Sequence, residues 1–250
     1  ISNPPPWRAK LQVVLGSLVL VLPTVVAYLP ALGVSFFWDD RHWILDNHLL
    51  GSWKGLQQIW FNPFAREVYY PLTVTTFWIE HHFWKFAPFG YHLLNLLLHI
   101  SNALLLWRVL VLLKVPASFF AAAIFAVHPI QVESVAWITE RKNVLSLFFY
   151  LFATLSWIRF HGLNTPQKGQ PGPFRFYLLT LSFFLCAALA KATAVGFPFW
   201  ALLLLWWKRG RVGKEDIAML LPAFLIGFAS GFLTLELEGG LIDRGPDGSE

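Results

Sequence analysis

Apolar stretches alternate with short polar segments along this chain, and seven of them approach the length that a helix needs to cross a bilayer, about 20 residues. They lie near residues 11–32, 89–113, 116–134, 143–160, 174–190, 194–207 and 216–235. The sixth is short for a full crossing, so the count is open by one. The pattern predicts an all-α protein, a polytopic transmembrane helical bundle of about seven spans.

The long segment between the first two stretches, residues 33–88, has a periodicity of its own. Apolar residues recur there at helical spacing and predict a helix that lies in the membrane interface: Trp53, Leu56, Ile59 and Trp60. Pro71 begins a second predicted helix, because proline is favoured in the first turn of a helix. One face of that helix carries Thr73, Phe77, Glu80 and Trp84.

Composition agrees with a membrane protein. Hydrophobic residues make up 56% of the chain and charged residues only 13%, which leaves too little polar surface for a soluble domain. Cys186 is the single cysteine, so the chain has no partner for an intrachain disulfide. There is no Walker sequence, no GxGxxG loop and no GxSxG elbow, so nucleotide hydrolysis, dinucleotide binding and serine-hydrolase chemistry have no support.

Charge placement predicts the orientation. If the N-terminus is cytoplasmic, the inner segments carry eleven of the 19 basic residues and two of the 14 acidic ones. Cytoplasmic loops have an excess of Lys and Arg, so this layout, with residues 33–88 as an outer loop, is the favoured one. The net charge of +5 then reflects a basic cytoplasmic face and requires no nucleic-acid partner.

Several charged residues fall at the same outer face on this topology. Asp39 and Asp40 directly follow the first apolar stretch, where they either end the span or take part in chemistry. The others in this set are Glu133, Glu140, Arg141, Lys142 and Lys191. Together they supply a base for an acceptor hydroxyl and cations for a leaving phosphate. The alternatives are a solvated turn at residues 140–142 and, for Lys191, a side chain that reaches to the lipid headgroups.

Histidines are frequent, but their spacing does not match a zinc site. His92 and His99 share a helical face, yet no His-x-x-x-His or Glu-x-x-His pattern occurs. We expect His99 to hydrogen-bond a neighbouring helix, together with Asn95 or Asn102. No cofactor is certain. A divalent cation is possible, because hard cations prefer carboxylates, and its candidate ligands are Asp39, Asp40 and Glu133.

Six segments occur in an order that is typical of one group of membrane enzymes: Phe37-Trp38-Asp39-Asp40 with Ile44 and Asn47, Tyr70-Pro71-Leu72-Thr73, residues 89–99, residues 128–135, residues 140–145, and Lys191 ahead of Gly196. In these segments the chain resembles the polytopic GT-C glycosyltransferases, specifically the transmembrane-and-TPR-containing O-mannosyltransferase-like proteins and their bacterial relatives. Residues 39–42 also resemble the Asp-Glu-x-His version found in the protein O-mannosyltransferases.

The resemblance implies a membrane glycosyltransferase that moves a sugar from a polyprenyl-phosphate donor to a hydroxyl of a protein or glycan acceptor, with inversion at the anomeric carbon. It makes Asp39 the catalytic base and Asp40 its support. The residues expected to contact the donor phosphate or the substrate are Arg41, His42, His128, Glu133, Glu140, Arg141, Lys142 and Lys191. The expected location is the extracytoplasmic face of a membrane, a bacterial inner membrane in the first instance.

Members of this group usually have more spans than the seven predicted here, often followed by TPR repeats. Residues 1–250 are therefore expected to be the N-terminal part of a longer transmembrane domain. Two other functions stay open from the sequence. One is a transporter or flippase of lipid-linked sugars, in which the same acids relay protons. The other is a catalytically inactive membrane scaffold that carries TPR repeats.

Overall fold

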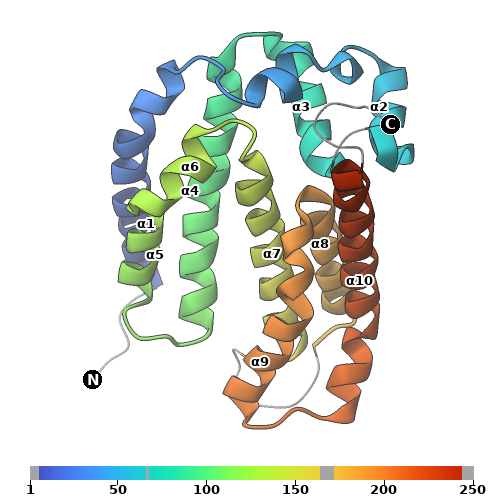
Figure 1. Cartoon of the computed structure of the whole chain (residues 1–250). Coiled ribbons are helices and arrows are strands. Elements are labelled where there is room, and N and C mark those ends of the chain that lie inside the picture. Colours follow the sequence, from blue (N-terminus) through green and yellow to red (C-terminus); the bar gives the residue numbers. More distant parts are fainter. Residues whose placement is uncertain (1–5, 66–67, 164–171, 244–250) are drawn as a thin grey trace.

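Most residues in the described part of the chain are helical, and no strand occurs in that part (Figure 1). The computed structural model describes residues 6–65, 68–163 and 172–243. Its α-helices are α1 (Pro6–Tyr28), α2 (Trp53–Phe61), α3 (Pro71–Trp84), α4 (Pro88–Leu112), α5 (Ser118–Val127), α6 (Val132–Ala136), α7 (Arg141–Phe160), α8 (Arg175–Ala190), α9 (Phe197–Arg209) and α10 (Lys214–Asp243). Short helical turns lie between several of them, including η1 (Leu29–Gly33), η2 (Arg41–Leu45) and η6 (Ala192–Gly196).

The long helices run side by side, and α2 and α3 lie together at one end of them, which we call the loop end (Figure 1). On one side of the molecule α1, α4 and α5 pack together. On the other side α7 packs with α8 and α9, and α10 packs against α8 and α9. Contacts between α4 and α7 join the two groups. The largest core lies in the second group, where Trp157, Phe184 and Phe197 are almost fully buried.

Within the described ranges, four helices are long and apolar enough to cross a membrane: Lys10–Gly33, Pro88–Leu112, Arg141–Phe160 and Lys214–Leu237. The pair α5 and α6, bent by 51°, is a fifth candidate. Helices occupy all seven predicted stretches, but α8 and α9 have only 16 and 13 residues, so the count of seven spans is not confirmed. Large apolar side chains exposed on the long helices, such as Val26 and Phe228, suit lipid contact and indicate an integral membrane protein.

Residues 33–88 contain the two helices that their periodicity predicts. The Trp60 indole donates a hydrogen bond to Thr75 Oγ1 at 3.0 Å, which joins α2 to α3. The Thr73 hydroxyl donates to the Ala190 carbonyl oxygen at 2.9 Å, which joins α3 to the last residue of α8. The segment is therefore packed against the bundle and forms one wall of the loop end.

Buried polar side chains on α4 bond to neighbouring elements, as the sequence predicts. Asn102 Nδ2 donates to the carbonyl oxygen of Val144 on α7 at 2.8 Å. His99 Nε2 lies 2.9 Å from the carbonyl oxygen of Ala126 on α5. Asn95 Nδ2 donates to carbonyl oxygens of the segment that leads into α7, the shortest of these bonds being 3.1 Å. These bonds fix the start of α7 relative to α4.

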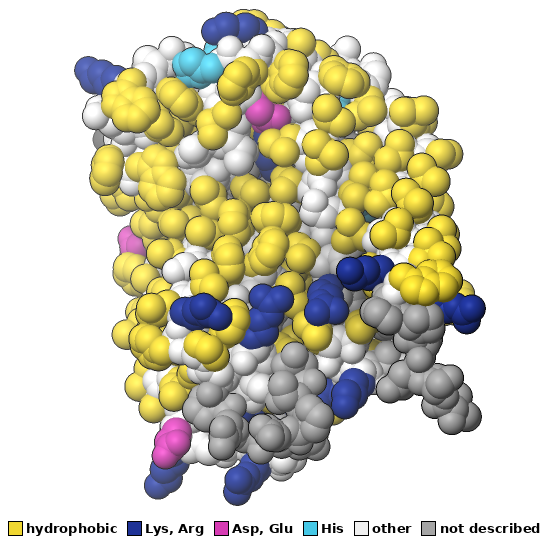
Figure 2. Space-filling view, turned by 180° about the vertical axis from the view of Figure 1, so that it is seen from behind, with side chains coloured by type: hydrophobic (Ala, Val, Ile, Leu, Met, Phe, Trp, Pro, Cys, Tyr) yellow, Lys and Arg dark blue, Asp and Glu magenta, His cyan; other side chains and the backbone are white. Residues whose placement is uncertain are grey.

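Basic side chains gather at the end of the molecule opposite the loop end (Figure 2). Apolar side chains cover most of the surface between them and the loop end. The basic residues there stand at helix ends and include Arg159 of α7, Arg175 of α8, Arg209 of α9 and Lys214 of α10. Such a separation is typical of a protein whose two ends face different compartments.

Candidate functional site

The acidic pair after the first long helix is divided by the fold. Asp40 is fully buried, and both of its carboxylate oxygens accept backbone N–H groups, Oδ1 from Thr139 at 3.0 Å and Oδ2 from Phe37 at 3.2 Å. Asp39 is only partly buried, and its Oδ1 accepts the hydroxyl of Thr139 at 2.8 Å. Asp40 therefore ties two distant segments together, whereas Asp39 keeps access to the surroundings.

Burial raises the pKa of the Asp40 carboxyl above its ordinary value. The hydrogen bonds from Phe37 and Thr139 oppose this, because they stabilise the charged form, and the neighbouring charge of Asp39 raises the pKa further. Because Asp40 is fully buried, its carboxylate is poorly placed to exchange a proton with a substrate or to bind a metal ion. Its role in the site is to hold the backbone around Asp39.

The backbone that leads into the pair is strained. Trp38 has φ of 49°, a left-handed conformation that costs a residue other than glycine about 1–3 kcal/mol and persists only when its surroundings enforce it. Its ring contacts that of Trp137 edge to face at 5.1 Å, and Phe37 stacks on Trp137 at 5.9 Å. Trp137 belongs to the same segment as Thr139, so this one segment supports both the strained backbone and the two carboxylates.

A second polar group lies at the start of α7, a few residues after Thr139. Lys191, in the break between α8 and η6, donates from Nζ to Asn143 Oδ1 at 2.5 Å. Asn143 Nδ2 donates in turn to Glu140 Oε2 at 2.6 Å, and Lys142 pairs with the other oxygen of Glu140 at 2.8 Å. Two cations and one carboxylate are thus linked through Asn143 at the start of α7.

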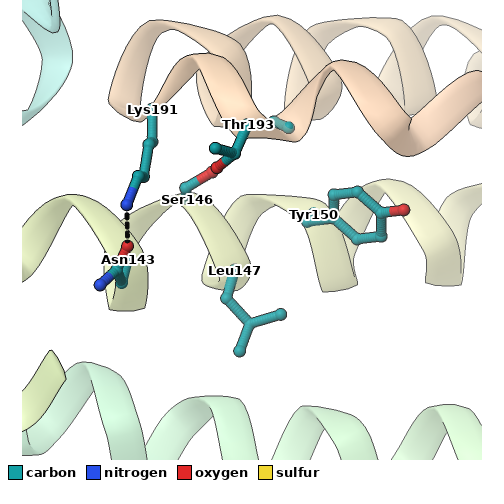
Figure 3. A pocket seen from close by; sticks show the side chains of 7 residues that line it. Asn143, Ser146, Leu147, Tyr150, Lys191 and Thr193 are labelled. Atoms are coloured by element: carbon teal, nitrogen blue, oxygen red, sulfur yellow. Dashed lines mark hydrogen bonds between the residues drawn. The ribbon is translucent and has the colours of Figure 1, made fainter.

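A cavity of about 210 Å³ opens beside Lys191 (Figure 3). Its polar lining comes from Lys191 and Asn143, with Ser146 and Thr193 pointing toward one another from facing elements. Apolar residues of α7 and η6 continue the lining away from the lysine: Leu147, Tyr150 and Ala194. A cavity with a cation at one end and apolar walls beyond suits an anionic headgroup that is attached to a hydrocarbon chain.

Burial lowers the pKa of Lys191 below its ordinary value. Among the charged neighbours Glu140 raises this pKa, Lys142 lowers it and Glu133 raises it. An incoming anion would compensate the partly buried ammonium more fully than Asn143 does, because a charged acceptor strengthens the bond.

Arg141 lies in the interior, which differs from the phosphate contact that the sequence predicts for it. Its side chain is fully buried and pairs with Glu80 of α3. It also donates to Asn95 Oδ1 at 2.8 Å and to the Tyr91 carbonyl oxygen at 2.7 Å, both on α4. Its guanidinium lies 4.6 Å from the ring centre of Phe77. With these donors engaged inside the protein, Arg141 acts as a junction of three helices.

The remaining predicted residues lie at the surface. Arg41 is exposed and pairs with Asp46 at 3.0 Å, and His42 is exposed beside it. His128 is exposed at the end of α5, where its Nδ1 accepts the N–H of Ile130 at 3.2 Å. Glu133 is exposed on α6, and its charge raises the pKa of Lys191. No contact joins these four to the cavity, so their predicted roles stay predictions.

Two members of the site are not among the residues that the sequence singles out as functional, Thr139 and Asn143. Neither carries a charge, and Thr139 is an isolated threonine in an apolar run. The only sequence signal of Thr139 is its position directly before the charged run of residues 140–142, whereas Asn143 lies in the segment 140–145 that contributes to the family resemblance. Among the described residues no group of three or more His, Cys, Asp and Glu side chains is arranged to hold a metal ion.

Several proteins of known name are similar to this chain, including two from Homo sapiens and one from Drosophila melanogaster. A protein O-mannosyl-transferase of Homo sapiens, TMTC3, is 34% identical over 179 residues, which cover 67% of this chain and 20% of the relative. Tmtc2 of Drosophila melanogaster, with the same description, is 32% identical over 68% of this chain and 19% of its own length. TMTC4 of Homo sapiens is 28% identical over 76% of this chain and 28% of its own length.

The matches cover only part of the relatives: this chain spans about a fifth to a quarter of the length of those it matches. No family model matches the chain. No solved structure matches it either. The similarity is therefore one of sequence to proteins that are several times longer.

Proposed function

The chain is homologous to the transmembrane-and-TPR-containing protein O-mannosyl-transferases of the GT-C superfamily, and we propose that it carries the catalytic residues of a membrane glycosyltransferase. The donor in this proposal is a sugar on a polyprenyl phosphate, and the acceptor is a hydroxyl of a protein or glycan. The reaction takes place at the loop end.

The observation that carries the proposal is the position of residues 139–143. Asp39 bonds to Thr139 at the beginning of this segment, and Lys191 bonds to Asn143 at its end. Thr139 and Asn143 are four positions apart, across the turn that leads into α7, so a candidate base and a candidate phosphate ligand are held by the two ends of one short segment. In the proposal the sugar lies between them, with the acceptor hydroxyl on the side of Asp39 and the phosphate on the side of Lys191.

In the proposed reaction the Asp39 carboxylate takes the proton of the acceptor hydroxyl. The acceptor oxygen forms a bond to the anomeric carbon as the bond from that carbon to the phosphate oxygen breaks. The polyprenyl phosphate leaves with the electron pair, and its added negative charge is stabilised by Lys191 and by Lys142. Because this is a single displacement, the anomeric centre is inverted.

The lining of the cavity supports the same placement of the donor. The phosphate meets Lys191 and Asn143, and the first isoprene units extend along the apolar residues of α7. A lipid carrier needs this combination, since its head must stay hydrated or paired while its tail stays in hydrocarbon. The segregation of basic residues to the opposite end supports a cytoplasmic N-terminus and a site outside the cytoplasm.

The test is a transfer assay with the purified full-length protein and a polyprenyl-phosphate mannose donor. Asp39→Asn keeps the shape of the side chain and removes its basicity, so transfer is expected to fall at least about 100-fold while insertion and expression stay normal. Glu215→Gln, at an exposed acid of the basic end, is the matched control. Full activity of Asp39→Asn would overturn the proposal, and movement of the lipid-linked sugar across the membrane without transfer would favour a flippase.

A further inference from the structure

Thr139 stands between the two carboxylates and bonds to both. Its backbone N–H donates to Asp40 Oδ1, and its hydroxyl donates to Asp39 Oδ1 at 2.8 Å. The residue itself is fully buried. A single threonine therefore performs two separable tasks, one through its backbone and one through its side chain.

The backbone task is structural. The N–H of Thr139 and the N–H of Phe37 together satisfy the buried carboxylate of Asp40, which would otherwise be costly to bury. This bond survives any substitution of Thr139 that keeps the backbone in place. A variant that lacks only the hydroxyl therefore leaves the link between residues 37–40 and the segment before α7 intact.

The side-chain task concerns Asp39 first, because Oδ1 of Asp39 accepts the hydroxyl; the hydroxyl also opposes the rise in the pKa of the buried Asp40 carboxyl. The hydroxyl holds Oδ1, and among the described residues Asp39 Oδ2 has no hydrogen-bond donor. One carboxylate oxygen is thus fixed and the other is left for an incoming group. A general base has to be held within hydrogen-bond reach of the proton it removes, and a misplacement of about 1 Å costs up to about 100-fold in rate.

We propose that Thr139 is a positioning residue: its hydroxyl fixes the Asp39 carboxylate so that Oδ2 faces the acceptor hydroxyl. The inference rests on the proposed function, because it assigns Thr139 to the base of that reaction. Thr139 touches no reacting atom and does not line the donor cavity, so it affects the chemical step and leaves donor binding unchanged.

The experiment compares Thr139→Val with Thr139→Ser. Valine keeps the shape of threonine and removes the hydroxyl, and we expect kcat to fall about 10- to 100-fold with an unchanged KM for the donor. Serine restores the hydroxyl, and its kcat is expected within about threefold of the unsubstituted protein. The matched control is Thr154→Val, which removes a buried hydroxyl that bonds only to the Tyr150 carbonyl oxygen of the same helix.

A double variant separates positioning from a general loss of structure. In the Asp39→Asn background, Thr139→Val is expected to cause a much smaller further loss, because the hydroxyl acts on the reaction mainly through the Asp39 carboxylate. Three results would each overturn the inference. Thr139→Val could reduce kcat equally with and without Asp39→Asn, it could raise KM in place of lowering kcat, or Thr139→Ser could be as slow as Thr139→Val. If Asp39→Asn itself keeps full activity, the proposed function fails first, and the two failures are thereby distinguished.

Discussion

Replacing Arg141 with methionine is expected to destabilise the protein strongly. The variant removes a buried guanidinium and leaves the carboxylate of Glu80 buried without its partner, since the Glu80 side chain is only 7% exposed. It also removes the hydrogen bond that Asn95 Oδ1 accepts on α4. The polar contacts that Arg141 makes from α7 to both α3 and α4 are lost in one step.

The magnitude follows from this geometry. Removing one partner of a buried ion pair costs about 3–5 kcal/mol, most of it the penalty of the charge left behind. For a chain of this size, about 1 kcal/mol corresponds to about 2–4 °C in Tm, so Arg141→Met is expected to lower Tm by about 10 °C. The double variant Arg141→Met with Glu80→Leu removes both charges. Its Tm is expected to recover at least about half of the decrease caused by Arg141→Met, because no buried charge remains unpaired.

The assay is thermal unfolding in detergent or nanodiscs, followed by the loss of the monodisperse peak or by tryptophan fluorescence. Arg159→Met is the matched control, because Arg159 lies in the last turn of the same helix and is exposed. Its Tm is expected within about 2 °C of the unsubstituted protein. The junction role would be refuted if the Tm of Arg141→Met were also within about 2 °C of the unsubstituted protein. It would also be refuted if the double variant Arg141→Met with Glu80→Leu were less stable than Arg141→Met alone.

Two further predictions concern packing and pH. Gly55→Ala is expected to weaken the packing of α2 and lower Tm, because a Cβ at Gly55 would lie 2.0 Å from the Leu49 carbonyl oxygen. Gly51→Ala is the control and is expected to leave Tm unchanged, because a Cβ at Gly51 would have no atom within 4 Å. Equal Tm values for the two variants would contradict this prediction. Burial lowers the pKa of Lys191 below the 10.5 of a free lysine, so its ammonium loses its proton at a lower pH. Donor binding is therefore expected to weaken with rising pH before pH 10.5 is reached. Lys191→Arg stays charged throughout this range, so its binding profile is expected to extend to higher pH, and identical alkaline limbs would exclude Lys191 as the titrating group.

Local pattern was enough to predict the helices of this chain. All seven apolar stretches are helical, and the spacing of Trp53 and Ile59 predicts α2. Periodicity does not show how many helices cross the membrane, because that depends on helix length and on contacts with neighbours. α8 and α9 illustrate this limit, since both are apolar and both are shorter than a bilayer requires.

The site was harder to predict, because its contacts join residues far apart in sequence. Asp39 and Thr139 are 100 positions apart, and Thr139 has no charge or motif that marks it. The run of residues 140–142 shows a second limit. Adjacent residues at the start of a helix point in different directions, so a run of charges does not show which of its side chains is buried. Arg141 turns into the protein toward Glu80, while Glu140 and Lys142 stay near Lys191.

The most direct test of the central claim measures donor binding and sugar transfer separately in Asp39→Asn and Lys191→Gln. If residues 139–143 place a base at one end and a phosphate ligand at the other, Asp39→Asn binds the polyprenyl-phosphate sugar with normal Kd and fails to transfer it. Lys191→Gln is then expected to raise the Kd for the donor about 10-fold or more, because a charge-assisted bond is lost. Lys214→Gln, at the basic end, is expected to change neither value. Unchanged donor binding in Lys191→Gln together with normal transfer in Asp39→Asn would contradict the account.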